Sequence, residues 1–317
     1  KVALASYLRV TRMMVVDPKQ IVIVNGSHQG LDLCARMLAD HGDPVWVEEP
    51  GYWGARNVLS AAGMEIKPIP LDAKGLAPMA EDWAQSPRLI FTSPSSQYPT
   101  GVVMSLDRRL ELLEGAFQSG SWIIEDDYDS KFHYAGKPKA CVQGLDQHER
   151  TIYIGTFTKS MFPGLRIGYM VLPTSLVAPM TVARTLLDGH SAPIAQLTLA
   201  RFIEGGHLGA HVRTMRAVYA ERRDVLARLV REHLGDFLEP QVPAGGMQMP
   251  CTLIRDISER TAVDCARTAG IDLLGLTQLH ASSQHKAGFL MGFAAHTPHE
   301  LEVAARKLAR VLRALCI

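Results

Sequence analysis

The chain has 317 residues, a formal net charge of +1, and 33 Lys and Arg residues mixed with 32 Asp and Glu residues. This balance argues against a basic nucleic-acid-binding face, and the lack of a long apolar run excludes a signal peptide and a transmembrane helix. Five widely spaced cysteines fit a reduced, cytoplasmic protein, and no group of His, Cys and Asp has the spacing of a metal site.

The first predicted element is an apolar strand over residues 21–24, which breaks at Asn25-Gly26. An amphipathic segment follows, so the pattern predicts a strand, a tight turn and the start of a helix, whose free N–H groups favour an anion. Gly26 would let the backbone approach that anion, and Ser27 would add a hydroxyl. The alternative is that Ser27 simply caps the helix. His28 is interpreted as a helix-start residue and not as a metal ligand.

Two further strand ends carry polar or aromatic turns. Residues 44–47 form a predicted strand that leads into Pro50-Gly51 and then Tyr52 and Trp53. One of these two rings could lie flat on a bound planar ring, although aromatic pairs in such turns often only pack. Residues 88–92 form another strand, and the Pro- and Gly-rich turn 93–101 after it carries polar groups that could reach a ligand.

The predicted strand 122–126 runs directly into the acidic run Glu125, Asp126 and Asp127, followed by Tyr128. A carboxylate at such a strand end can hold a proton on a heterocyclic nitrogen, and a nearby tyrosine can hydrogen-bond a phenolic oxygen. We select Asp126 for the first role and Tyr128 for the second. At least one of the three carboxylates is expected only to cap the following turn.

The predicted strand 151–155 ends in a Gly-Thr-Phe-Thr sequence and then Lys159. A lysine in an apolar shell past the carboxyl end of a strand can lose its proton and form a Schiff base with a carbonyl. Thr156, Thr158 and Arg166 supply hydroxyls and a positive charge suited to a phosphate. Lys159 could instead be an ordinary solvated lysine. Together with Asp126, however, the pattern indicates pyridoxal phosphate, whose pyridine nitrogen needs an acidic partner.

Seven strands alternate with helical patterns over the first 172 residues, which predicts a doubly wound, mostly parallel α/β sheet. Their expected positions are 21–24, 44–47, 65–69, 88–92, 122–126, 151–155 and 167–172. The rest of the chain has helical patterns over 193–233, short strands near 247–254 and 289–294, and an amphipathic helix over 298–315. We therefore predict a large cofactor-binding domain (1–192), then a connecting helix and a small α+β domain (193–317). Gly245-Gly246 marks either a close approach of a small-domain strand to the ligand or a plain bend.

The order of these motifs resembles that of fold-type I (aspartate aminotransferase-like) pyridoxal phosphate proteins. The segments IIEDDYDSKFHYAGKP, YIGTFTKSMFPGLRIGYMVLP and SQYPTGVVMSLDRRLELL are similar to the aminotransferase-like domain of MocR-type regulators, a branch of the GntR family. The resemblance covers nearly the whole chain. It implies that Lys159 is the Schiff-base lysine, that Asp126 and Tyr128 contact the cofactor ring, and that Tyr52 stacks on it. Ser27, Thr156 and Arg166 become phosphate contacts beside Gly26.

The same resemblance implies partners. Proteins of this fold usually share their sites across a homodimer. In MocR-type regulators a winged-helix DNA-binding region and the first part of the aminotransferase-like domain would precede the segment that begins at Lys1. DNA contact is therefore expected only through a region absent from this chain, and no membrane contact is expected.

Three departures from the family pattern bear on ligand choice. Tyr98 stands where free-standing aminotransferases usually have Asn, and Ser96 stands where MocR-like chains commonly have His. Residues 288–296 contain no arginine, although amino-acid aminotransferases place one near here to clamp the substrate carboxylate, and the nearest cation candidates are Lys286 and His296. The pocket is therefore expected to prefer a different amine or a different carboxylate geometry.

The sequence thus predicts an effector-sensing domain in which an amine or amino acid displaces Lys159 and changes how the two domains close. Weak transamination remains chemically possible, because a freed Lys159 could remove a proton next to the amine. One alternative is a free-standing class I/II aminotransferase. Another is a sensor of pyridoxal phosphate that accepts no amine.

Overall fold

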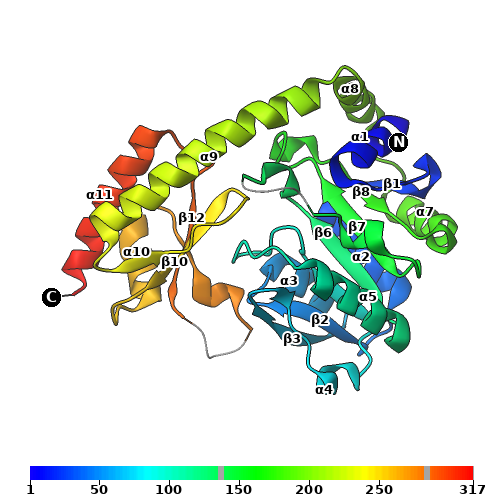
Figure 1. Ribbon diagram of the computed structural model, residues 1–317, viewed down its shortest axis with the longest axis horizontal. Coiled ribbons are helices and arrows are strands. Elements are labelled where there is room, and N and C mark those ends of the chain that lie inside the picture. Colours follow the sequence, from blue (N-terminus) through cyan, green and yellow to red (C-terminus); the bar gives the residue numbers. More distant parts are fainter. Residues whose placement is uncertain (135–138, 282–285, 317) are drawn as a thin grey trace.

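The computed structural model describes residues 1–134, 139–281 and 286–316, and it contains two sheets joined by one long helix (Figure 1). The large sheet has the strand order β1-β8-β7-β6-β5-β2-β3-β4. Its strands are β1 (Ile21–Val24), β2 (Pro44–Glu49), β3 (Glu65–Asp72), β4 (Gly75–Leu76), β5 (Leu89–Thr92), β6 (Trp122–Asp127), β7 (Thr151–Thr156) and β8 (Gly168–Val171).

The central strands of the large sheet pair in parallel, whereas β8 and β4 run antiparallel to their neighbours. Strands β5, β6 and β7 are buried along almost their whole length, as expected for parallel strands with both faces covered. One face packs against α2 (Ser27–Leu38), α3 (Trp53–Ala61) and α7 (Thr174–Asp188). The other packs against α1 (Val2–Arg12), α5 (Leu106–Ser119) and α6 (Val142–Leu145). The carboxyl ends of β5, β6 and β7 therefore meet at one edge of a covered sheet.

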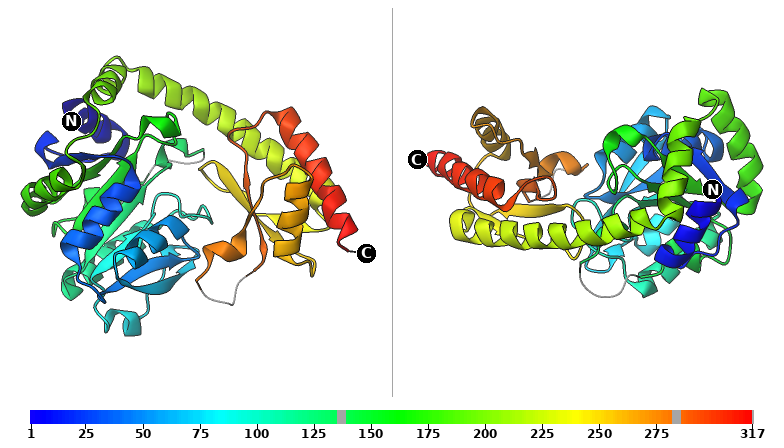
Figure 2. Two further views of the ribbon diagram at one scale, coloured as in Figure 1. Left: turned by 180° about the vertical axis from the view of Figure 1, so that it is seen from behind. Right: turned by 90° about the horizontal axis from the view of Figure 1, so that it is seen from above.

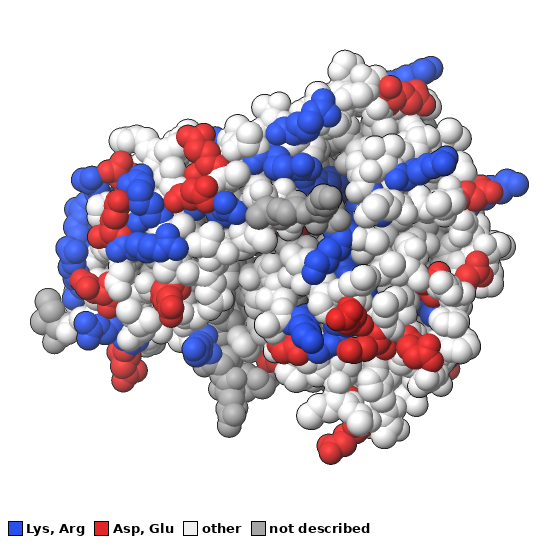
Figure 3. Space-filling view, in the orientation of Figure 1, with Lys and Arg blue, Asp and Glu red and all other residues white. Residues whose placement is uncertain are grey.

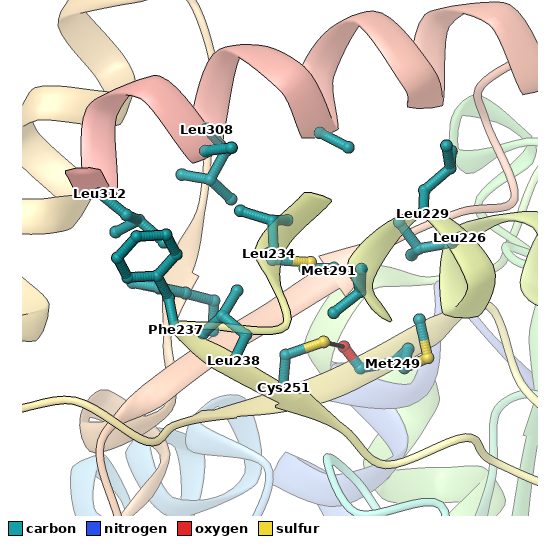
Figure 4. Close-up of a cluster of buried hydrophobic side chains, with 14 of the residues drawn as sticks. Leu226, Leu229, Leu234, Phe237, Leu238, Met249, Cys251, Met291, Leu308 and Leu312 are labelled. Carbon is teal, nitrogen blue, oxygen red and sulfur yellow. Dashed lines mark hydrogen bonds between the residues drawn. The ribbon is translucent and has the colours of Figure 1, made fainter. Parts of the chain in front are cut away.

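The second sheet is smaller and fully antiparallel, with the order β11-β12-β10-β9. Its strands are β9 (Leu238–Pro240), β10 (Gln248–Leu253), β11 (Leu274–Gly275) and β12 (Gly288–Gly292). Three helices cover it, namely α9 (His207–Leu234), α10 (Glu259–Thr268) and α11 (Pro298–Ala314). Figure 4 shows the resulting core, in which Leu308 of α11 and Leu234 of α9 face Met291 and Cys251 of the sheet.

Helix α9 belongs to both cores. Leu208 and Val212 near its start, with Leu199 of α8 (Pro193–Glu204), are buried in the large-sheet core. Further along, the buried residues of the helix that belong to the small-domain core are Leu226, Ala227, Leu229, Val230 and Leu234. The helix runs along one side of the molecule from one lobe to the other (Figure 2). We propose that 193–234 is the connecting element between a large domain (1–192) and a small C-terminal domain.

The seven predicted strands are all present, five of them within one residue of their expected bounds, whereas β2 and β3 extend two and three residues further. The predicted final helix is also present, with Leu301, Leu308 and Leu312 buried on its inner face. Three strands of two or three residues (β4, β9 and β11) were not predicted, because runs this short show no alternation of apolar and polar residues.

The remaining short elements are helix α4 (Ala80–Trp83) and four 3₁₀ turns at Pro18–Gln20, Ser130–Phe132, Pro163–Leu165 and Leu276–Leu279. Within the described ranges, no helix is long and apolar enough to cross a membrane. Lys and Arg side chains stand among Asp and Glu over the face shown in Figure 3, in keeping with the balanced composition.

Candidate functional site

A cavity of about 360 Å³ lies where the carboxyl ends of β1, β2, β5, β6 and β7 meet. This is the edge at which open α/β sheets bind ligands, and the volume is within the range of small-molecule sites. Its lining comprises Gly26, Ser27, His28, Tyr52, Trp53, Ser93, Tyr98, Asp126, Tyr128, Thr156, Thr158, Lys159, Arg166 and Gln248. All eight residues selected from the sequence, together with Thr158, are therefore brought to one cavity.

One end of the cavity is suited to an anion. Gly26 has φ +97° and is the N-cap of α2, with no side-chain cap, so the alternative that Ser27 caps this helix is wrong. Arg166 donates from Nη2 to the carbonyl of Asn25 at 2.9 Å, and a Cβ on Gly26 would lie 3.2 Å from the same nitrogen. Glycine thus keeps space where the free N–H groups of α2 and the guanidinium of Arg166 converge.

The hydroxyls of Thr156 and Thr158 lie beside this end. The Thr158 N–H donates to Thr156 Oγ1 at 3.1 Å, and the two hydroxyl oxygens are 2.9 Å apart. Both residues line the cavity, which places two further hydroxyls near Arg166. A positive charge, helix N–H groups and hydroxyls together form the donor set that a phosphate uses.

The last three residues of β6 are the carboxylates Glu125, Asp126 and Asp127. Because alternate side chains of a strand point to opposite faces, Asp126 lies on the face opposite to that of the other two. Glu125 accepts a hydrogen bond from the Gln143 N–H at 2.9 Å. Asp127 lies 3.0 Å from Arg12 Nε and accepts from Ser130 Oγ at 2.7 Å and from its N–H at 3.1 Å, so it is the carboxylate that caps the following turn. Asp126 alone of the three lines the cavity.

Asp126 is buried, and its Oδ1 has no hydrogen-bond partner among the described residues. Burial and the nearby Asp127 and Glu48 carboxylates raise the pKa of Asp126 to about 7. Asp127 is the opposite case, because burial, which would raise its pKa, is outweighed by the Arg12 and Lys131 charges together with hydrogen bonds from Ser130 and Tyr153, which lower the pKa to about 2. The cavity therefore holds one carboxyl oxygen that is ready to accept a proton or a hydrogen bond from a ligand.

Lys159 lies across the same cavity and is exposed to it. As the sequence indicated, the lining that Lys159 shares includes the hydroxyls of Thr156 and Thr158 and the guanidinium of Arg166. The amine therefore owes its place to the turn that follows β7, and it remains accessible to a carbonyl group entering the cavity.

Aromatic rings form one wall. Tyr52 and Tyr98 pack edge to face with centroids 5.7 Å apart, and Tyr98 packs against Tyr128 at 6.2 Å. The hydroxyl of Tyr52 lies 2.7 Å from His28 Nε2, which fixes the ring at the cavity. Trp53 also lines the cavity but is 45% exposed, so the half-buried Tyr52 is the better candidate for stacking on a bound ring.

Comparison with known proteins decides the family. The model for "Aminotransferase class I and II" matches residues 1–308. The chain belongs to this family. The match confirms the class of protein that the order of the sequence motifs indicated.

Solved structures of the family share the fold. A kynurenine aminotransferase from Pyrococcus horikoshii, crystallised in complex with PMP, is 28% identical and superposes with a TM-score of 0.89 over 99% of this chain and 79% of that one. The predicted fold-type I architecture is therefore confirmed.

Two regulatory proteins are also similar in sequence to this chain. The "Probable rhizopine catabolism regulatory protein MocR" of Rhizobium meliloti is 38% identical over 315 residues, which are 99% of this chain and 64% of that protein. The HTH-type regulator YhdI of Bacillus subtilis is 34% identical over 306 residues, or 96% of this chain and 65% of that protein. The chain spans just under two thirds of each regulator. The resemblance to MocR-type sequences is confirmed.

Two residues that shape the site were not found from the sequence. Arg12, at the end of α1, is buried against Asp127 and donates to Ser95 Oγ at 2.7 Å. Gln248, the first residue of β10, lines the cavity from the small domain. No motif surrounds Arg12, and the Gly245-Gly246 pair next to Gln248 marked the strand without singling out this side chain. Within the described part of the chain, no three His, Cys, Asp or Glu side chains are placed to hold a metal ion.

The paired glycines before β10 approach the large domain. Gly246 (φ +85°) donates its N–H to the Phe132 carbonyl at 2.9 Å, and a Cβ there would lie 2.8 Å from Asp129 Oδ2. Gly245 bridges His133 in antiparallel fashion. Neither residue lines the cavity, so the two glycines are needed for contact between the domains and not for contact with a ligand. This contact lies between the segment carrying Asp126 and Tyr128 and the strand carrying Gln248.

Replacing Gly246 with alanine is expected to destabilise the fold more than the same change at Gly42. Both residues have φ near +85°, but a Cβ at Gly42 meets nothing within 4 Å. The backbone strain is therefore matched, and the additional loss of about 1–2 kcal/mol at Gly246 would come from the clash with Asp129. Urea unfolding of both variants measures the difference. Equal urea midpoints for the two variants would show that Asp129 can move away from the added methyl group without loss of stability.

Proposed function

We propose that this chain binds pyridoxal phosphate and senses an amine or amino acid as the effector domain of a MocR/GntR-type transcriptional regulator. The observation that carries the cofactor proposal is the unpartnered, buried Oδ1 of Asp126 in the same cavity as Lys159 and Arg166. A pyridinium N–H is the kind of donor that satisfies such an oxygen.

When bound, pyridoxal phosphate supplies an aldehyde that condenses with amines and a ring that withdraws electrons. In this proposal Lys159 would provide the amine that holds the cofactor, at a place that a ligand amine can also reach. Asp126 keeps the proton on the ring nitrogen, and Tyr128 hydrogen-bonds the phenolic oxygen. Arg166, with Ser27 and Thr156, binds the phosphate beside Gly26, and Tyr52 packs on the ring face.

Similarity to the two regulators supports a regulatory role. Because the chain matches less than two thirds of either, DNA contact is assigned in this proposal to other parts of a longer protein. The effector's influence would pass through the Asp129–Tyr134 segment, whose backbone joins the small domain at Gly245 and Gly246. The five free cysteines support a cytoplasmic location.

A second candidate function is an aminotransferase. It is supported by the close superposition on the kynurenine aminotransferase and by the accessible Lys159 amine, which could move a proton at the carbon next to the ligand nitrogen. In a third alternative the domain senses only pyridoxal phosphate. The same residues would bind the cofactor, but Lys159 would not move a proton on a ligand.

Visible spectroscopy of the chain loaded with pyridoxal phosphate distinguishes these functions. For an effector domain, added amines or amino acids should change the absorption of the lysine-linked cofactor without release of a keto acid, and the change should reverse on dialysis. Continuous release of a keto acid would favour the aminotransferase, and a spectrum unchanged by every amine would favour a sensor of the cofactor alone. No new absorption band with pyridoxal phosphate would contradict the cofactor assignment.

A further inference from the structure

His28 lines the cavity, but the proposed function gives its side chain no role. It is the second residue of α2, so its backbone N–H is one of the free N–H groups at the helix end beside Gly26. Its imidazole contacts Tyr52, with Nε2 2.7 Å from the Tyr52 hydroxyl oxygen and the ring centroids 5.8 Å apart. His28 therefore joins the helix end suited to a phosphate and the aromatic ring suited to stacking.

The protonation states of the two side chains fit a hydrogen bond from the hydroxyl to the imidazole. Burial and the Arg166 charge lower the pKa of His28, so the imidazole is mostly neutral at pH 7. Burial and the Asp126 charge raise the pKa of Tyr52, so its hydroxyl keeps its proton. A phenol can donate to the imidazole nitrogen that carries no proton, which is Nε2 when the imidazole proton is on Nδ1.

The other contacts of the Tyr52 ring are not directional. Tyr52 is the N-cap residue of α3, and its side chain is half-buried. A Cβ on Gly54 would lie 2.4 Å from Tyr52 Cζ, so glycine leaves room for the ring, and Tyr98 packs against it edge to face. Among the residues that the structure describes, His28 is the hydrogen-bond partner of the Tyr52 hydroxyl. This bond therefore determines the tilt of the ring more closely than packing does.

The tethered ring borders the region of the Asp126 carboxyl. His28, Tyr52 and Asp126 line a narrow space next to the cavity, together with Phe91 and Ile154. The energy of two stacked rings depends on their offset and tilt. A planar ring that meets Asp126 at its edge would therefore be bound less well if Tyr52 lost its fixed orientation.

We propose that His28 is a positioning residue that acts on the cofactor through the Tyr52 hydroxyl, by fixing the tilt of the ring that packs on the cofactor. This rests on the proposed function, in which pyridoxal phosphate occupies the cavity. In this role the imidazole does not touch the cofactor, so its whole contribution to binding depends on the Tyr52 hydroxyl. Removing the hydroxyl and removing the imidazole should then have the same consequence.

A double-mutant cycle tests this, with the affinity for pyridoxal phosphate measured from the visible absorption of the chain. His28→Ala keeps the N–H groups of α2 and removes the imidazole, and Tyr52→Phe keeps the ring and removes the hydroxyl. Each is expected to weaken binding about fivefold, the size of one lost hydrogen bond, and the double variant no further. His28→Gln, whose carboxamide oxygen can accept from the hydroxyl, should restore most of the affinity. The circular dichroism of the cofactor band, which depends on the orientation of nearby rings, should fall in both single variants.

His299→Ala is the matched control, because His299 is also the second residue of a helix, α11, and is exposed outside the cavity. It should bind the cofactor as the wild type does. Inorganic phosphate, which competes for the phosphate end of the cavity, should bind equally to the wild type and to His28→Ala.

Two results would assign His28 to direct contact with the cofactor and overturn the proposal: losses that multiply in the double variant, or weaker binding of inorganic phosphate by His28→Ala. Failure of His28→Gln to restore affinity would also overturn it. The absence of any absorption band in the wild type would contradict the proposed function itself. A normal wild-type band with unchanged affinity in His28→Ala would contradict only the role of His28.

Discussion

Replacing Lys159 with alanine is expected to abolish covalent attachment of pyridoxal phosphate while leaving weaker binding of the free aldehyde. The side chain is exposed to the cavity, and its removal leaves Asp126, Arg166 and the helix N-terminus at Gly26 unchanged. The visible band of the lysine-linked cofactor should disappear, and borohydride reduction should no longer add the cofactor's mass to the chain.

Lys74→Ala is the control for that experiment, since Lys74 is exposed in the turn before β4 and outside the cavity. It should retain both the band and the added mass. A second candidate amine exists, because the buried Lys131 lies 3.4 Å from the Thr156 carbonyl, close to the site. If Lys159→Ala kept the band and the added mass mapped to Lys131, the assignment of Lys159 would be wrong.

The site residues could be predicted because each follows a strand whose apolar character is plain in the sequence. In a parallel sheet the carboxyl ends of β5, β6 and β7 must lie at the same edge, so Asp126 and Lys159 were expected to meet. Strand alternation then separates Asp126 from Glu125 and Asp127. The acidic motif could not show which carboxylate forms an ion pair within the protein. That carboxylate is Asp127, and its partner Arg12 lies more than a hundred residues earlier in the chain.

Other features depended on contacts between distant segments. The Gly245-Gly246 pair before Gln248 was noticed, but only the pairing of β10 with β12 and the approach of Gly246 to Asp129 bring the Gln248 side chain to the cavity. The exposure of Lys159 could not be decided from the sequence, because the apolar strand before it says nothing about the direction of the loop that follows. Sequence patterns thus located strand ends, and tertiary contacts determined the polarity of what surrounds them.

Asp126→Asn is expected to make the cofactor-free chain more stable at pH 8 but not at pH 4. The pKa of the carboxyl is 3.8 in its ordinary state and about 7 in the folded chain, so the folded state holds the proton more tightly than the unfolded state. Below about pH 4 the group is protonated in both states and does not change the free energy of unfolding. Between pH 4 and pH 7 its ionisation lowers the free energy of unfolding increasingly, and above pH 7 the loss is constant. Asparagine is neutral at every pH, so the free energy of unfolding of the variant should exceed that of the wild type by on the order of 3 kcal/mol at pH 8. Urea unfolding at the two pH values measures this.

The same substitution should weaken binding of pyridoxal phosphate about ten- to a hundredfold, because a charge-assisted hydrogen bond to the ring nitrogen is lost. Asp129→Asn is the matched control. Asp129 is also buried with an unpartnered oxygen, and burial and Asp127 raise its pKa to about 8, but it does not line the cavity. It should therefore gain stability at high pH and keep its affinity for the cofactor. Equal losses of affinity in both variants would mean that Asp126 acts only through the general charge of this segment and not as the partner of the ring nitrogen.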